Sequence, residues 1–300
     1  MLPCISHRVP IDAGEHRLDT YCLNQFAQLA SRSQVRRLFK RGALRVRDLE
    51  AGCTWWIRPG WVIELELPDC LPGPSYTTQL NVIYLDDHLA IVDKPAGLVV
   101  GGNRYRTMSR ALPTTLPLSP AIDALGVPVP VHRLDARTQG LMVVARSARA
   151  QVALGRAFHD RTVHKHYQAL VIGKLAGEGQ VDLPVEGRQA HTDYRAIEIV
   201  RSITVGWITR VSVWPKTGRK HQIRRHLSSL GHAVLGDERY PSHEQILKGQ
   251  GLFLAAVGLK LPHPITGETL VVTRLPPPKF ASFMSREQRR WRKYHPEDSD

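Results

Sequence analysis

Apolar residues at helical spacing mark the first ordered segment of the chain. Four of them recur every three or four positions and predict an amphipathic helix: Leu18, Cys22, Phe26 and Leu29. A second helix is predicted to start at Ser31 or Ser33, because either hydroxyl could cap it, and to end before Gly42. The apolar positions of this second helix would pack it against the first helix.

Alternating apolar and polar residues follow the two helices. Residues 63–67 alternate strictly, which predicts a strand with one buried face, and 43–47 and 55–57 are further strand candidates. A turn containing Pro and Gly at 58–60 joins the last two. The pattern therefore predicts a small α/β domain over residues 13–68.

A run rich in proline and glycine separates this small domain from the rest of the chain. Four of the eight residues 68–75 are Pro or Gly, which is typical of a linker, and we place the linker at 69–79. A second domain is expected at 80–275. The remaining residues, 276–300, form a basic amphipathic tail to which the sequence assigns no specific role.

The second domain carries many strand patterns and few helical ones. Strands are predicted at 80–85, 89–92, 140–145, 167–172 and 208–214, and helices at 148–159 and 219–230. The first two strands would form a hairpin. Many strands with scattered helices predict an α+β fold around a mixed, mainly antiparallel sheet.

Composition places the chain among ordinary globular proteins. It has 300 residues, of which 42% are hydrophobic and 23% charged, and it lacks an apolar stretch long enough to cross a bilayer. The N-terminus has no basic segment followed by an apolar one, as a secretory signal would. We therefore expect a cytoplasmic protein.

An excess of positive charge points to a polyanionic partner. Lys plus Arg number 41 against 27 Asp plus Glu, which gives a formal charge of +14. Nucleic acid is the first candidate and an acidic membrane the second, while the alternative is a charge that only keeps the protein in solution. The second predicted helix carries cations that could follow a phosphate backbone: Arg32, Arg36, Arg37 and Lys40.

Cysteine usage argues against a metal site or a disulfide framework. The four cysteines are widely spread, and none forms a Cys-x-x-Cys pair or lies beside a histidine at ligand spacing: Cys4, Cys22, Cys53 and Cys70. We therefore expect no bound metal.

The tetrapeptide His-Arg-Leu-Asp occurs twice, ending at Asp19 and at Asp135. The first copy opens a predicted helix, where Asp19 suits the positive end of the helix dipole. The second copy lies in a loop before the strand predicted from Gly140, and loops held by a rigid sheet commonly carry catalytic residues. Asp135 is therefore the candidate catalytic group.

The segment around Asp135 resembles the signature loop of the RluA-type pseudouridine synthases, in which this aspartate is catalytic. Other segments that resemble the family follow in the expected order: 93–98, 164–170, 216–227, 235–237 and 263–268. Residues 215–227 are similar to the branch of the family named tRNA pseudouridine synthase C. The small domain, residues 13–68, resembles the S-four-like RNA-binding domain of ribosomal and RNA-modifying proteins.

The resemblance implies roles for individual residues. Arg224 should pair with Asp135, and Tyr167 should stack on a target uridine that is flipped out of its RNA. Phosphate contacts are expected from nearby cations: Lys94, Arg133, Lys165, Arg219, Lys220 and Arg225. Ala136 stands where arginine is common in the family, so we expect different RNA contacts there.

The implied reaction is the isomerisation of uridine to pseudouridine in a structured RNA. The glycosidic bond to nitrogen breaks and the base rejoins through carbon, without net redox change, so no cofactor is expected. The aspartate could attack covalently or remove a ribose proton. Ribosomal RNA is slightly favoured over transfer RNA as substrate, and a monomer is expected.

Two other function classes stay open. The first is a non-catalytic RNA-binding or ribosome-assembly protein on the same fold. The second is a nucleic-acid lyase or hydrolase using the same carboxylate, which usually needs a metal cluster or a paired second carboxylate. Neither of these partner groups is visible in the sequence.

Overall fold

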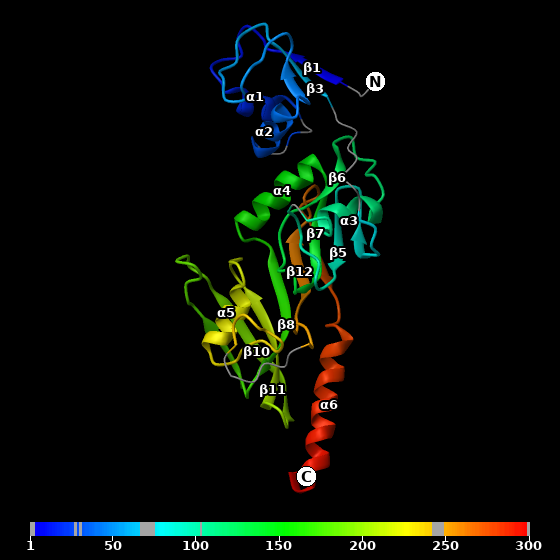
Figure 1. The fold of residues 1–300 in the computed structure, drawn as a ribbon, viewed down its shortest axis with the longest axis vertical. Helices are drawn as coiled ribbons and strands as arrows, with labels where there is room; N and C mark the ends of the chain where they lie inside the picture. Colours follow the sequence, from blue (N-terminus) through cyan, green and yellow to red (C-terminus); the bar gives the residue numbers. More distant parts are fainter. Residues whose placement is uncertain are drawn as a thin grey trace.

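The structure is a computed structural model, and it describes residues 4–298 except 27–28, 30–31, 67–75, 103 and 242–248. The described residues form a three-stranded sheet and a ten-stranded sheet. Figure 1 shows the small N-terminal sheet at one end of an elongated molecule and the C-terminus at the other. None of the helices in the described residues is long and apolar enough to span a membrane.

The N-terminal unit packs an antiparallel sheet of order β1-β3-β2 against two helices. Its strands are β1 (Cys4–Arg8), β2 (Leu44–Val46) and β3 (Val62–Glu66), and its helices are α1 (Leu18–Gln25) and α2 (Arg32–Lys40). Both predicted helices are present. The proposed cap Ser31 and most of the linker lie outside the described residues.

The sequence misjudged two parts of this unit. Residues 55–57 form no strand, because their only ladder contact is an isolated bridge between Trp56 and Arg17. Strand β1 was not predicted, yet it pairs with β3 along its whole length. The sheet therefore begins N-terminal to the predicted range 13–68.

The second sheet has the order β4-β5-β7-β12-β8-β11-β10-β9, with β6 paired to β7 and β13 paired to β12. Only the pairing of β12 with β7 is parallel among the described strands, which confirms the mixed, mainly antiparallel sheet. The strands are β4 (Asn81–Leu85), β5 (Leu89–Lys94), β6 (Ala124–Pro130), β7 (Gln139–Ser147), β8 (His164–Ile172), β9 (Glu178–Val181), β10 (Thr192–Ser202), β11 (Gly206–Pro215), β12 (Leu254–Pro262) and β13 (Thr269–Thr273).

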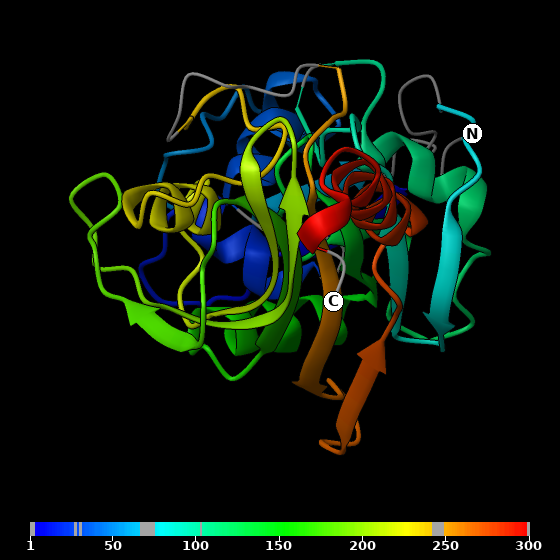
Figure 2. The ribbon, with the colours of Figure 1, turned by 90° about the horizontal axis from the view of Figure 1, so that it is seen from below.

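Helices cover both faces of this sheet, and alternation along β8 separates the two faces. Tyr167, Ala169 and Val171 join one core with helices α3 (Met108–Thr115) and α5 (Gln222–Ser229). Leu170 and Ile172 point into another core with helix α6 (Pro278–Tyr294). Helix α4 (Ala148–His159) packs through a third core against β5 and β7. Figure 2 shows α6 beside the β10–β11 hairpin.

Candidate active site

Asp135 lies in the loop between β6 and β7, and its neighbours fix the loop backbone. The carbonyl of Ala136 accepts a hydrogen bond of 2.7 Å from the amide of Gly97, and the amide of Thr138 donates to the Asp135 carbonyl at 3.0 Å. Leu134 is buried beneath the loop. The carboxylate of Asp135, 17% exposed, is therefore presented by a well-anchored loop.

The strand after this loop begins where only glycine fits. Gly140 has φ +120°, and a Cβ at this position would collide with the carbonyl oxygen of Ala256. This close approach lies within the parallel pairing of β12 with β7. The glycine of the signature loop thus serves the sheet that carries Asp135.

Lys94 does not contact phosphate, contrary to the sequence-based expectation. Its side chain is fully buried, and its ammonium donates to the carbonyls of Pro95 at 2.9 Å and Ala136 at 3.1 Å. Burial lowers the pKa of Lys94 to about 8, against the attraction of Asp135 and Asp93. The lysine supports the loop that carries Asp135 and offers no surface to RNA.

Arg224 reaches Asp135 from α5 but is held by a different carboxylate. Its Nη1 lies 3.8 Å from Asp135 Oδ2, whereas Nε and Nη2 each bind Asp237 at 2.6 Å. This fork leaves Nη1 as the part of the guanidinium directed at Asp135. The sequence placed Asp237 in a family segment but gave it no role.

Asp237 is itself firmly held. Its Oδ1 also accepts hydrogen bonds from the amides of Arg239 at 2.9 Å and Tyr240 at 3.2 Å. Burial alone would raise the pKa of Asp237, but the hydrogen bonds from Arg224 and from the Arg239 amide outweigh it, and the pKa lies below its ordinary value. Asp237 is therefore ionised near neutral pH and fixes the orientation of Arg224.

His221 is a second neighbour of Asp135 that the sequence did not single out. Its Nε2 lies 3.7 Å from Asp135 Oδ1, and its Nδ1 is 2.9 Å from the hydroxyl of Tyr240. His221 adopts a left-handed backbone, with φ 56°, directly before α5. The helix predicted at 219–230 therefore starts only at Gln222.

Tyr167 is a third group close to Asp135. Only 9% of the residue is exposed, and β8 carries it between Val213 of β11 and Ala256 of β12. Burial, and then the charge of Asp135, raise the pKa of Tyr167 well above its ordinary value. The phenol therefore stays neutral and presents a largely apolar ring.

A cleft of about 800 Å³ joins these groups. Seven of the residues predicted from the sequence line it: Arg133, Asp135, Lys165, Tyr167, Arg219, Lys220 and Arg224. The ammonium of Lys165 donates to the carbonyl of Thr217 at 3.1 Å, and burial, followed by repulsion from Arg161, lowers its pKa to about 8. Cations, the carboxylates of Asp135 and Glu186, and the aromatic ring of Tyr167 line this cleft, a set that suits a nucleotide of a polyanion.

The other predicted RNA contacts lie outside this cleft. Arg225 binds Glu186 at 2.8 Å and the Tyr240 hydroxyl at 3.1 Å. The cations of α2 belong to the N-terminal unit and are exposed. One of them, Arg36, binds the buried Asp19 at 3.2 Å, so the first His-Arg-Leu-Asp copy ties α1 to α2.

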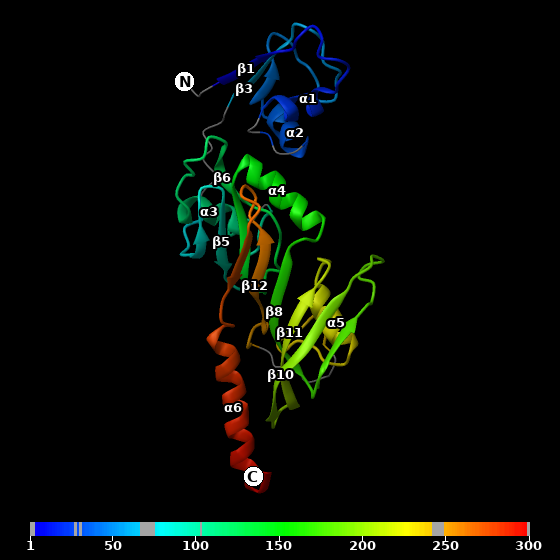
Figure 3. The same cartoon turned by 180° about the vertical axis from the view of Figure 1, so that it is seen from behind.

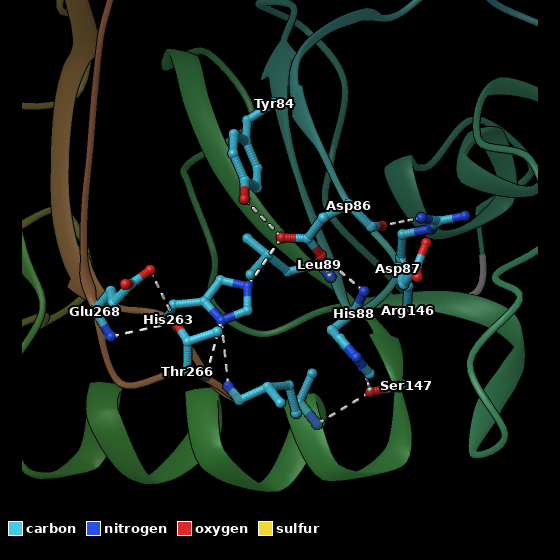
Figure 4. Close-up of polar contacts among 12 residues, drawn as sticks. Tyr84, Asp86, Asp87, His88, Leu89, Arg146, Ser147, His263, Thr266 and Glu268 are labelled. Atoms are coloured by element: carbon cyan, nitrogen blue, oxygen red, sulfur yellow. Dashed lines mark hydrogen bonds and ion pairs between the residues drawn. The ribbon is translucent and has the colours of Figure 1, made fainter.

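One family segment proves to be a structural tie away from the cleft. Figure 4 shows His263 donating to Asp86, which also accepts from the hydroxyl of Tyr84. The distances are 2.9 Å and 2.7 Å, and the other ring nitrogen of His263 accepts from the amide of Thr266 at 3.1 Å. This network joins the β4–β5 turn to the β12–β13 turn and explains the segment 263–268.

A metal site does not appear in the described part of the chain, where no three His, Cys, Asp or Glu side chains gather as ligands would. His132, a cleft residue, instead accepts a hydrogen bond from the Val143 amide at 2.9 Å. Burial, and then Lys165, lower the pKa of His132 to about 3, so it is neutral.

Known proteins that are similar to this chain are RNA pseudouridine synthases, the class that the sequence motifs resemble. A family model described as RNA pseudouridylate synthase matches residues 88–229. Ribosomal large subunit pseudouridine synthase D of Nitrosomonas europaea is 34% identical, with 88% of this chain and 82% of that protein covered. Dual-specificity RNA pseudouridine synthase RluA of Haemophilus influenzae is 36% identical over 66% of this chain and 94% of that protein.

Solved structures agree on the fold. The human RNA pseudouridylate synthase domain containing 4 is 25% identical and superposes with a TM-score of 0.54, covering 69% of this chain and 92% of that one. The mixed sheet, the loop with Asp135 and these relatives define an enzyme that makes pseudouridine in RNA. The chain belongs to the RluA-type family of RNA pseudouridine synthases.

Proposed function

We propose that this protein converts a uridine of ribosomal RNA into pseudouridine and that Asp135 is the reacting carboxylate. The observation that supports this most is the cleft itself, in which Asp135 faces Arg224 at 3.8 Å beside the ring of Tyr167. The flipped-out uridine would enter this cleft with its base against Tyr167. Arg224 would hold the carboxylate in place.

The reaction needs only groups that the chain provides. The bond from the ribose to the base nitrogen breaks, the base turns, and a bond to a base carbon forms. That carbon loses its hydrogen as a proton, and the freed nitrogen takes up a proton, so the product is an isomer of the substrate. Atoms and electrons balance without an oxidant, a reductant or a transferred group, so the proposal includes no cofactor. Covalent attack by Asp135 and removal of a ribose proton are both compatible with its position.

Ribosomal RNA is the substrate that we favour. Two relatives that cover 88% and 92% of this chain are named for the ribosomal large subunit, while the RluA relative is named as dual-specificity, so transfer RNA is the second candidate. The N-terminal unit would dock the RNA through Arg32, Arg37 and Lys40, which α2 exposes as an S-four-like domain would. We place the reaction in the cytoplasm, carried out by a monomer.

Pseudouridine mapping tests this proposal. Cells that lack the protein are compared with cells that regain the wild type or Asp135→Asn, and pseudouridine is located in their ribosomal and transfer RNA. We expect one or a few ribosomal positions that need the wild type and stay unmodified with the variant. Sites confined to transfer RNA would overturn the substrate, and sites restored by Asp135→Asn would overturn the role of Asp135.

A further inference from the structure

Helix α6 presents a basic surface on the face of the sheet that is opposite the cleft. Phe280, Phe283 and Met284 bury one side of the helix in the core formed with Leu170 and Ile172. Tyr167, which lines the cleft, points to the other face of the same strand. Figures 1 and 3 show α6 running beside the β10–β11 hairpin to the far end of the molecule.

The exposed charged residues of α6 are all cationic. Its exposed basic residues are Arg286, Arg289, Arg290, Arg292 and Lys293. The single acidic residue of the helix, Glu287, is 1% exposed and binds Ser202 Oγ at 2.7 Å and Arg290 at 3.1 Å. Arg289, Arg292 and Lys293 therefore meet no neutralising carboxylate within the helix.

Trp291 of α6 and Trp207 of the neighbouring strand β11 lie close to further cations. The guanidinium of Arg201 lies 3.7 Å from the ring centre of Trp207 and 5.1 Å from that of Trp291. The ammonium of Lys174 lies 5.0 Å from the Trp207 ring. Flat rings interleaved with cations are typical of surfaces that follow a nucleic-acid strand.

We propose that this α6 surface, made of Lys174, Arg201, Trp207, Arg289, Trp291, Arg292 and Lys293, is a second RNA-binding surface. It would hold the backbone of substrate RNA at a distance from the uridine in the cleft. Because the two sites lie on opposite faces of one sheet, only an RNA long enough to pass around the domain can occupy both. The enzyme would thereby prefer a large folded RNA to a short stem-loop.

An acidic membrane fits this surface less well. A helix that lies on a membrane inserts an apolar face between the lipids, but the apolar face of α6 is already buried against the sheet. A helix that only aids solubility has no need of two tryptophans beside its arginines. The inference rests on the RNA substrate of the family and not on the role of Asp135.

Filter binding to deproteinised large-subunit ribosomal RNA tests the proposal. The variant Arg289→Gln/Arg292→Gln is compared with Arg156→Gln/Lys260→Gln, which removes two exposed cations from α4 and β12. Each lost phosphate contact should make the negative slope of log K against log salt shallower by about 0.9, so the slope of the α6 pair should be shallower by up to ~1.8. We also expect this pair to bind the RNA roughly tenfold more weakly near 0.1 M salt. The control pair should bind as the wild type does.

Two further measurements separate the α6 surface from the cleft and from effects of the substitutions. Binding of a short oligouridine, which can occupy only the cleft, should be the same for all three proteins. Ultraviolet crosslinking of the wild type to the same ribosomal RNA should yield crosslinked peptides from residues 286–295.

Equal weakening of RNA binding by both pairs of substitutions, unchanged RNA binding by the α6 pair, or no crosslink in 286–295 would overturn the proposal. Binding to vesicles of acidic phospholipid is measured for the same three proteins. If the α6 pair lost vesicle binding but kept RNA binding, the α6 surface would be a membrane site instead. Because no arm measures catalysis, failure of the Asp135 assignment would leave these outcomes readable.

Discussion

Asp237 decides how the buried guanidinium of Arg224 meets Asp135. Asp237→Asn keeps the size of the side chain but removes its negative charge. In the wild type, the two carboxylate oxygens each accept a hydrogen bond of 2.6 Å from Arg224. Breaking a buried pair in this way costs about 3–5 kcal/mol of unfolding free energy, since one buried charge loses its partner. We expect that loss in urea unfolding, and at least a ~100-fold fall in kcat because Arg224 is free to turn.

A matched control lies next in the chain. Glu238 pairs with Arg137 at 3.0 Å, and both side chains are close to half exposed. Exposed pairs contribute about 0–1 kcal/mol, so Glu238→Gln should leave the unfolding free energy within that range. If the two variants were equally stable, Asp237 would not be the anchor that its contacts indicate.

Lys94 predicts a specific dependence of stability on pH. Its pKa is about 8 in the folded protein against an ordinary 10.5, so between these values the unfolded chain binds more protons than the folded one. The free energy of unfolding of the wild type, relative to Lys94→Met, should therefore rise from pH 8 toward 10.5, by up to about 3 kcal/mol. Below pH 8 the difference should be constant. Urea unfolding of both proteins across this range measures it, and a constant difference would contradict the buried ammonium.

At the scale of residues, the sequence located the groups that line the cleft better than the groups that support them. Asp135, Tyr167 and Arg224 stand in segments with a family resemblance, and the structure brings all three to one cleft. Asp237 and His221 were missed as neighbours because their roles depend on contacts between distant segments. Lys94 was misjudged because burial of a lysine cannot be read from a Lys-Pro pair.

Among the elements, α6 depends on one buried polar contact. Glu287 is enclosed under the helix, where it binds Ser202 of β10 and Arg290 of the next turn. Glu287→Ala would leave the buried Ser202 hydroxyl without this acceptor, which costs about 1–3 kcal/mol. Compared with the wild type, we expect this variant to be cleaved faster within α6 in limited proteolysis and to have a lower free energy of unfolding. Gln288→Ala, on the exposed side of the helix, serves as control, and an equal effect there would refute the tie.

Helices and strands whose apolar residues recur at regular spacing were predicted well. Elements whose position depends on pairing with distant strands were not. Helix α4 coincides with its prediction at 148–159, since Ser147 caps it and its apolar residues face one core. Strand β10 went unpredicted because many of its residues are exposed, although it pairs over its length with β11. The late start of α5 follows from the backbone of His221, which no local pattern shows.

For the whole molecule, the fold class followed from the sequence but the strand order did not. Many alternating strands indicated a mainly antiparallel sheet, which is what the described strands form. The parallel contact of β7 with β12 joins residues over a hundred positions apart and depends on Gly140 meeting Ala256. Such pairing depends on the packed chain as a whole.

The N-terminal unit gives a prediction at this scale. Removing three exposed charges of α2 with Arg32→Gln/Arg37→Gln/Lys40→Gln should weaken binding of ribosomal RNA and reduce its salt dependence, because phosphate contacts release counterions. At saturating RNA, kcat should stay unchanged, since α2 does not line the cleft. Single-turnover rates over a range of enzyme concentrations separate the two effects. A fall in the saturated rate with unchanged binding would argue against a docking role.

The most direct test of the central claim is release of tritium from RNA labelled at carbon 5 of uracil. Wild-type protein and Asp135→Asn are incubated with total cellular RNA, and folding of the variant is checked by its unfolding curve. We predict release by the wild type and a loss of at least ~10⁴-fold in rate for the variant, as expected when an essential reacting group is removed. Comparable release by a folded Asp135→Asn protein would contradict the assignment of the chemistry to Asp135.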